Sequence, residues 1–164
     1  MQKSKLMRSF TVLLAVVVMF TFTAMTAFAA ESGSGQSSNK KPVKATFTRT
    51  IFQYTSAKDG TAVMNKAVKK KTKKSVIVYG YANYNGIKYK VTKIKKTAFK
   101  SLKKMTTLKF AKDAKNIKKI EKGAFKNNKK LKVIKISKKM TNKQYKKLVK
   151  LIKAAGYKGE IKRY

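Results

Sequence analysis

The chain contains no cysteine, no histidine and no tryptophan, and it has one proline and only five acidic residues among 164. Without cysteine it forms neither a disulfide nor a thiolate zinc site, and without histidine it lacks the usual base for catalysis near neutral pH. Five dispersed carboxylates leave little material for acid–base or metal chemistry. We therefore expect a protein without a catalytic site, without a cofactor and without a small-molecule substrate.

Basic residues are present in large excess, because 43 lysines and arginines give the chain a net charge of +38. Such a charge favours attraction to a polyanion such as a wall polymer, an anionic membrane, a host glycan or nucleic acid. A lysine-favouring genome that acts on solvent positions would produce the same composition. Arginine is scarce, which argues against base-specific recognition of nucleic acid, since that relies on the bidentate guanidinium.

The first 29 residues have the pattern of a secretory signal peptide. Basic residues precede an apolar run over residues 10–22, and Ala27 and Ala29 supply the small side chains before a cleavage site. A retained membrane anchor is the alternative, but the run is shorter than the roughly 20 residues that span a bilayer. We expect cleavage after Ala29, a flexible spacer over residues 30–44, which are rich in serine and glycine, and a domain over residues 45–164.

Two β-hairpins are predicted at the start of this domain. Asp-Gly and Asn-Gly, which tolerate the positive φ of tight turns, each lie between stretches rich in β-branched and aromatic residues. The hairpins pair residues 46–54 with 61–68 around Asp59-Gly60, and residues 76–84 with 87–94 around Asn85-Gly86. The second hairpin carries tyrosines that could stack on sugars or bases, or could pack as ordinary strand residues. They are Tyr79, Tyr81, Tyr84 and Tyr89.

An internal repeat with a period of 26 residues follows the second hairpin. Apolar residues recur at this offset more often than chance would give. Pairs that lie two residues apart, such as Leu108 with Phe110, predict short strands whose apolar side faces inward. The residues assigned to this repeat core are Ile94, Ala98, Phe99, Met105, Leu108, Phe110, Ile117, Ile120, Ala124, Phe125, Leu131, Ile134 and Ile136.

An amphipathic helix is predicted near the C-terminus. Thr141 and Gln144 have the spacing of a capping box, Gly156 would end the helix, and residues 160–164 predict a final edge strand. The apolar face of the helix would cap the end of the repeats, or the helix would dock on an anionic membrane. The candidate residues for contact with a membrane or polyanion are Lys143, Lys146, Lys147, Lys150 and Lys153.

Two further patterns are weak candidates for chemistry. Asp113 and Glu121 lie within one repeat connection, but the residues one period earlier are not acidic, so a paired-carboxylate site has little support. The strings at residues 38–41 and 101–104 match S-x-x-K, a spacing found for serine nucleophiles. Chance explains such strings in a chain this rich in lysine.

The strings VTKIKKTAFKSLKKMTTLKF and IKKIEKGAFKNNKKLKVIKI resemble the leucine-rich repeats of the bacterial surface type called BspA-like. The preceding YNGIKYKVTKI resembles the hairpin that leads into such repeats. The chain departs from the family in having two full units, with Leu102 and Asn128 where a cysteine is frequent. The resemblance implies an α+β fold in which two β-hairpins lead into a short leucine-rich repeat solenoid, capped by the C-terminal helix.

The resemblance also implies a function, because such repeats present a sheet face to their partners. We expect a secreted, non-enzymatic module that interacts with a protein or a cell surface. The alternative is a strongly cationic effector that binds anionic wall polymers, membranes or nucleic acid non-specifically, and its charge would also hold it at the cell wall.

Overall fold

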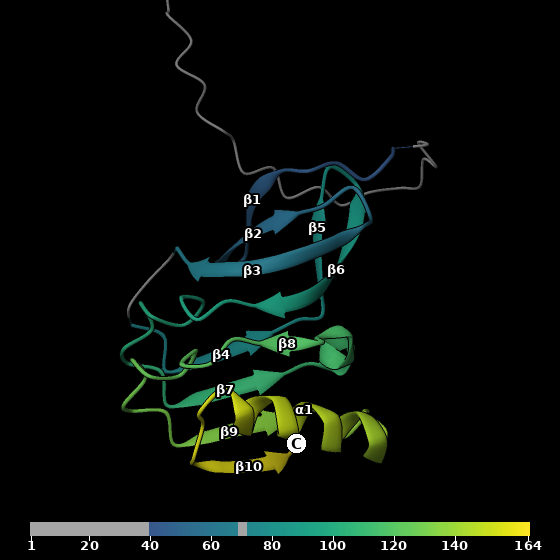
Figure 1. Ribbon diagram of the computed structural model, residues 1–164. Coiled ribbons are helices and arrows are strands. Elements are labelled where there is room, and N and C mark those ends of the chain that lie inside the picture. Colours follow the sequence, from purple (N-terminus) through teal and green to yellow (C-terminus); the bar gives the residue numbers. More distant parts are fainter. Residues whose placement is uncertain (1–39, 69–71) are drawn as a thin grey trace, which may run out of the picture. The chain divides into compact units, whose positions relative to one another are not determined.

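The computed structural model describes residues 40–68 and 72–164, which carry two β-sheets, one 3-10 helix and one α-helix (Figure 1). The predicted signal peptide and most of the predicted spacer lie outside the described residues. No helix in the described part of the chain is long and apolar enough to cross a membrane.

The first sheet has the strand order β1-β2-β3-β6-β5, with the short strand β8 also paired to β6. Pairing is antiparallel except between β3 and β6 and between β6 and β8, which are parallel. The strands are β1 (Thr46–Arg49), β2 (Phe52–Ser56), β3 (Thr61–Ala67), β5 (Tyr81–Tyr84), β6 (Ile87–Ile94) and β8 (Lys119–Ile120).

The second sheet is parallel throughout, with the order β10-β9-β7-β4. Leu108 pairs with Ile134 in this sheet and Ile94 pairs with Ile120 in the first, so the 26-residue offset of the sequence is the offset between paired strands. Strands β4 and β10 extend the sheet on either side of the two strands that the repeat predicts. The four strands are β4 (Ser75–Val78), β7 (Thr107–Phe110), β9 (Val133–Ile136) and β10 (Glu160–Arg163).

The prediction of one strand over residues 46–54 is wrong, because the chain reverses at Thr50 and Ile51 between β1 and β2. Thr50 has a φ of 55°, an unusual value for a β-branched residue. Phe47 and Phe52 are both buried but lie five positions apart, and a continuous strand would point them to opposite faces. The turn allows both rings to enter the core, and β2 then pairs with β3 across the predicted Asp59-Gly60 turn.

The prediction of one strand over residues 76–84 is also wrong, since β4 belongs to the second sheet and only β5 pairs with β6. The Asn85-Gly86 turn forms as predicted, with φ values of 48° and 76°. The strand breaks at Gly80, where a Cβ atom would overlap the backbone carbonyl of Asp113 in the 3-10 helix η1 (Lys112–Asn116). This close approach leaves no room for a side chain and turns the chain from one sheet to the other.

The core contains a column of aromatic rings that crosses the repeats. Phe99 and Phe125 stack with centroids 5.5 Å apart and an interplanar angle of 10°. Phe52 contacts Phe99 edge-on at 5.9 Å, and Tyr157 contacts Phe125 edge-on at 5.6 Å. Every residue of the predicted repeat core is buried except Leu131, which is half-buried and packs against that core.

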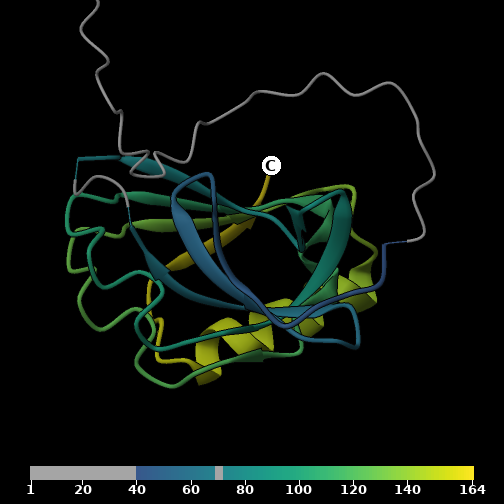
Figure 2. The ribbon, with the colours of Figure 1, turned by 90° about the horizontal axis from the view of Figure 1, so that it is seen from above.

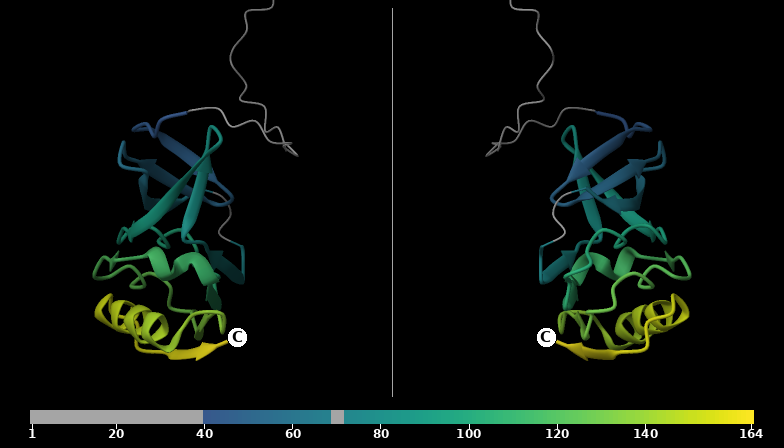
Figure 3. Two further views of the ribbon diagram at one scale, coloured as in Figure 1. Left: turned by 90° about the vertical axis from the view of Figure 1, so that its right-hand side faces the viewer. Right: turned by 90° about the vertical axis from the view of Figure 1, so that its left-hand side faces the viewer.

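Helix α1 (Asn142–Ala154) begins with a capping box, in which Gln144 N donates to Thr141 Oγ1 and Thr141 N donates to Gln144 Oε1. Its apolar face is already packed, because Leu148 and Ile152 are buried. The helix contacts β8 and η1, and Figures 2 and 3 show it on one side of the core with β10 on the other.

Candidate functional site

Three lysines form a row on the outer face of the second sheet. In that sheet Lys109 pairs with Lys135, and Lys135 pairs with Lys162, so the three side chains lie side by side on strands β7, β9 and β10. Their neighbours Leu108 and Ile134 are buried, and the alternation of side chains along a strand therefore directs the lysines outward. We call Lys109, Lys135 and Lys162 the lysine ladder.

The lysine ladder places like charges on neighbouring strands about 4.8 Å apart. Charges held at the strand spacing would repel each other by about 0.9 kcal/mol at the dielectric constant of water, and the flexible side chains reduce this value by spreading apart. Lys162 is relieved by Glu160, whose Oε1 lies 3.0 Å from its Nζ, and Lys109 Nζ lies 5.3 Å from the ring centroid of Tyr164. Lys135, in the middle, forms no ion pair with any described residue. An anion placed over the ladder would remove this repulsion.

A hollow lies beside this face, with a volume of about 250 Å³. Its wall combines aromatic rings with one cation, one carboxylate and one amide. We call it the tyrosine hollow, and its lining residues are Arg49, Thr50, Tyr54, Tyr79, Tyr81, Asn83 and Asp113.

Two unusual backbone features build the tyrosine hollow. The turn at Thr50, with its positive φ, brings the end of β1 to the rim. Gly80 allows η1 to approach the link between β4 and β5, which places Asp113 near Tyr79 and Tyr81. Asn116 holds this approach, because its Nδ2 donates to the Gly80 carbonyl at 3.1 Å.

The hollow presents both donors and acceptors of hydrogen bonds. The Tyr54 ring is buried, and burial raises the pKa of its hydroxyl, with Asp113 adding to the rise and Arg49 opposing it. The phenol therefore stays protonated at any physiological pH. Within residues 40–68 and 72–164 neither Arg49 nor Asp113 is part of an ion pair, so both charged groups can bind a ligand.

The tyrosine hollow and the lysine ladder adjoin each other along β4. Ile77 of β4 pairs with Lys109 of the ladder, and Tyr79 of the hollow follows Ile77 by two residues. Burial raises the pKa of the Tyr164 ring hydroxyl, and the neighbouring Tyr79 and Asp113 raise it further. Lys109 of the ladder lies over that same ring. A ligand that fills the hollow can therefore continue along the ladder.

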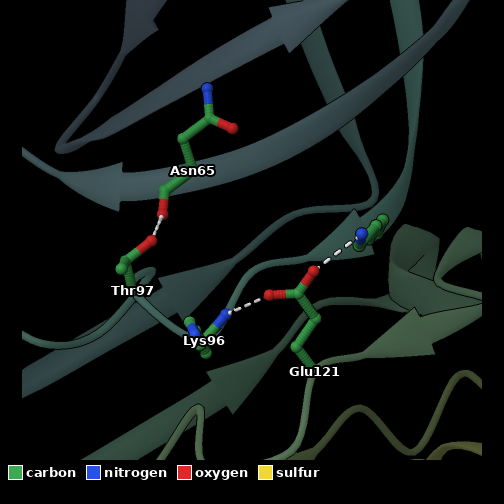
Figure 4. Close-up of polar contacts among 5 residues, drawn as sticks. Asn65, Lys96, Thr97 and Glu121 are labelled. Atoms are coloured by element: carbon green, nitrogen blue, oxygen red, sulfur yellow. Dashed lines mark hydrogen bonds and ion pairs between the residues drawn. The ribbon is translucent and has the colours of Figure 1, made fainter.

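The two carboxylates that the sequence brings to one repeat connection have different surroundings. Glu121 forms an ion pair with Lys93, with 2.7 Å between Oε1 and Nζ, and accepts a hydrogen bond from Lys96 N at 2.9 Å (Figure 4). These contacts hold the pKa of Glu121 below its usual value. Glu121 thus joins two successive repeats, whereas Asp113 lines the hollow.

The other singled-out residues are placed as follows. The α1 lysines Lys143, Lys146, Lys147, Lys150 and Lys153 are all exposed. Tyr84 stacks on Phe47 at 4.6 Å, and the buried Tyr89 accepts a hydrogen bond from Val43 N. Ser101 of the second S-x-x-K string donates to the Ala67 carbonyl, while Ser38 of the first lies outside the described residues. The described residues contain no cluster of acidic side chains that could hold a metal ion.

Sequence reasoning missed the lysine ladder and most of the tyrosine hollow. The sequence does contain a signal for the ladder, because Lys109 and Lys135 lie one 26-residue period apart on predicted strands. Among the residues of the hollow, the sequence points to Tyr79 and Tyr81 as possible stacking rings and to Asp113 only as half of a carboxylate pair, and it does not point to Tyr54 or Arg49. No local pattern connects Arg49 with Asp113.

Comparison with known proteins gives a family match for part of the chain. Residues 80–149 match the family described as the BspA type leucine rich repeat region (6 copies), which confirms the resemblance seen in the residues. A leucine rich cell surface protein from Faecalibacterium prausnitzii A2-165 is similar in structure, with a TM-score of 0.49 and 20% identity over 59% of this chain. The match spans 24% of that protein's length. Among curated sequences there is no significant match.

Proposed function

Residues 80–149 are a BspA-type leucine-rich repeat region, and from this premise we propose that the protein is a secreted surface-interaction module that binds an anionic polymer of a cell surface. In this proposal residues 1–29 are a signal peptide, the module has no enzymatic activity, and the stacked strands form a short solenoid. The second sheet is the face that meets the partner.

The lysine ladder is the observation that carries this proposal. Three in-register lysines offer an anionic polymer several contacts at once, and each contact releases condensed counterions. A bound anion relieves the repulsion that remains at Lys109 and Lys135, which adds to the affinity. The exposed charge elsewhere on the domain contributes long-range attraction without selecting a site.

The amphipathic helix α1 is a weaker candidate for the binding surface than the lysine ladder. Its lysines are exposed, but Leu148 and Ile152 on the opposite face are buried in the domain. Insertion into a membrane would require these side chains to leave the core, which would open cavities in the domain and lose its packing contacts. We therefore assign the helix a capping role and the ladder the binding role.

The test measures binding of a fluorescent polyphosphate chain to three proteins: the parent, the ladder variant K109Q/K135Q and the matched helix variant K146Q/K150Q. Both variants lose two charges. We expect the ladder variant to bind at least tenfold more weakly at 50 mM salt and the helix variant to change less than threefold. Parent binding falls at least about a hundredfold between 50 and 200 mM salt, because several counterions are released.

Equal losses in the two variants would refute the proposal, because binding would then depend on overall charge and not on the ladder. Absence of any binding by the parent protein at 50 mM salt would refute it as well. Thermal unfolding of each variant checks that the substitutions leave the fold intact, because Lys109 and Lys135 are half-buried whereas Lys146 and Lys150 are exposed.

A further inference from the structure

We propose that the tyrosine hollow binds a sugar ring that carries an anionic group, so that the polymer on the lysine ladder is an acidic polysaccharide. This inference rests on the proposed function, since it names the chemistry of the same partner. It concerns a different set of residues, however, and can fail separately.

The size and lining of the hollow fit one sugar ring. Its volume of about 250 Å³ lies just below the roughly 300–1,000 Å³ of pockets for drug-sized ligands. Tyr79 supplies exposed aromatic surface, and Tyr81 adds a second ring that has Lys88 Nζ 4.4 Å from its centroid. The negative face of an aromatic ring attracts the electropositive C–H groups of a pyranose. Tyr79 is 43% exposed, so a ligand can reach its ring without any movement of the core.

The polar groups of the hollow favour a saccharide over a simple polyanion as its ligand. Arg49 offers a planar fork of donors that suits a carboxylate or phosphate. Asp113 offers only acceptors when it is ionised, and it would repel a bare anionic chain. A sugar satisfies both, because its hydroxyls donate to Asp113 and Asn83 while its acidic group binds Arg49.

The backbone strain around the hollow agrees with a binding role. Thr50 has a positive φ, and Gly80 packs so closely against Asp113 that no side chain fits. Both features lie at the wall or the rim of the hollow. Of the two, only Thr50 is a strained position, and strained positions concentrate at ligand sites, where they fix the geometry of binding groups.

The main test is the D113N variant, because the two explanations of anion binding predict opposite signs for it. If the hollow recognises hydroxyls, loss of the ionised acceptor weakens binding of tetragalacturonate, a tetrasaccharide with one carboxylate on each ring. If only charge matters, removal of a negative charge strengthens that binding. The matched control is D59N, which removes a carboxylate from an exposed turn outside the hollow.

We expect D113N and Y79A each to weaken tetragalacturonate binding at least tenfold, and D59N to change it less than twofold. Polyphosphate has no ring and no hydroxyls, so its binding should be unchanged or strengthened in D113N and unchanged in Y79A. Cellotetraose, which is neutral, should bind at least tenfold more weakly than tetragalacturonate. NMR signals of Tyr79 and Tyr81 should shift with the acidic saccharide and not with polyphosphate.

Stronger binding of tetragalacturonate by D113N, or unchanged binding by Y79A, would overturn the inference. Tighter binding of an oligothymidylate with the same charge would assign the hollow to nucleic-acid bases and overturn it too. Failure of the hollow variants alone leaves the lysine ladder and the proposed function intact. Failure of K109Q/K135Q to weaken polyphosphate binding, with the hollow variants behaving as expected, refutes the proposed function and keeps the saccharide site.

Discussion

Replacement of Phe99 by alanine tests whether the aromatic column holds the repeats together. Phe99 is fully buried, stacks on Phe125 at 5.5 Å and meets the edge of Phe52 at 5.9 Å. It is therefore the ring that links the N-terminal strands to the second repeat. Phe125 occupies the equivalent position one period later and retains 6% exposure.

The expected cost follows from burial and from ring contacts. Truncation of a buried phenylalanine to alanine costs about 3–5 kcal/mol, and each aromatic pair contributes about 0.5–1.5 kcal/mol beyond its buried area. We expect F99A, which loses two ring contacts at a fully buried site, to cost about 4–5 kcal/mol. F125A should cost about 3–4 kcal/mol, because its site is slightly exposed. At the lower end of the usual stability range of about 5–15 kcal/mol, either loss brings the domain near unfolding.

Urea denaturation followed by circular dichroism at one fixed salt concentration measures these values. The double variant F99A/F125A completes a mutant cycle, and the stacked pair should give a coupling of about 0.5–1.5 kcal/mol. Y79A is the control for an exposed aromatic residue and should cost no more than about 0.5 kcal/mol. Costs below about 1 kcal/mol for both phenylalanine variants would show that the repeats are not packed around this column.

Two further predictions concern contacts between repeats. The lowered pKa of Glu121 means that its ionised form stabilises the fold above the ordinary glutamate pKa of about 4.3, and this contribution is lost as the pH falls through the lowered value. E121Q should therefore cost about 1 kcal/mol at pH 7, and its stability should fall less steeply in acid; identical acid denaturation curves would contradict this. G80A should lower the free energy of unfolding by about 1–3 kcal/mol and displace Asp113, since the added Cβ atom would overlap the backbone carbonyl of Asp113. Unchanged saccharide binding by G80A would contradict the placement of η1.

The repeat register could be predicted from the sequence because equivalent positions of successive 26-residue repeats are buried and must be apolar. Leu108 and Ile134 face the same core from paired strands, so a polar residue at either position would leave a buried gap or an unpaired group. The capping box of α1 was predictable for a similar reason, because Thr141 and Gln144 satisfy each other within four residues. Both features depend on local spacing or on a fixed offset.

The two strand breaks were missed because the surrounding residues have high strand propensity on both sides of each break. The first break had a signal, since Phe47 and Phe52 are an odd number of positions apart and cannot share a face of one strand. The second depends on Gly80, and the need for glycine there comes from the distant carbonyl of Asp113. A single glycine between tyrosines does not show which segment will pack against it.

The surroundings of the few carboxylates explain why Asp113 stands out as a binding residue. Among the described residues, Asp59 accepts hydrogen bonds from Thr61, Glu121 binds Lys93 and Lys96, and Glu160 pairs with Lys162. Asp113 has no such partner, in a chain where lysines outnumber acidic groups everywhere. Its backbone lies against Gly80 and its side chain lines the hollow, where the carboxylate can accept hydrogen bonds from the hydroxyls of a ligand.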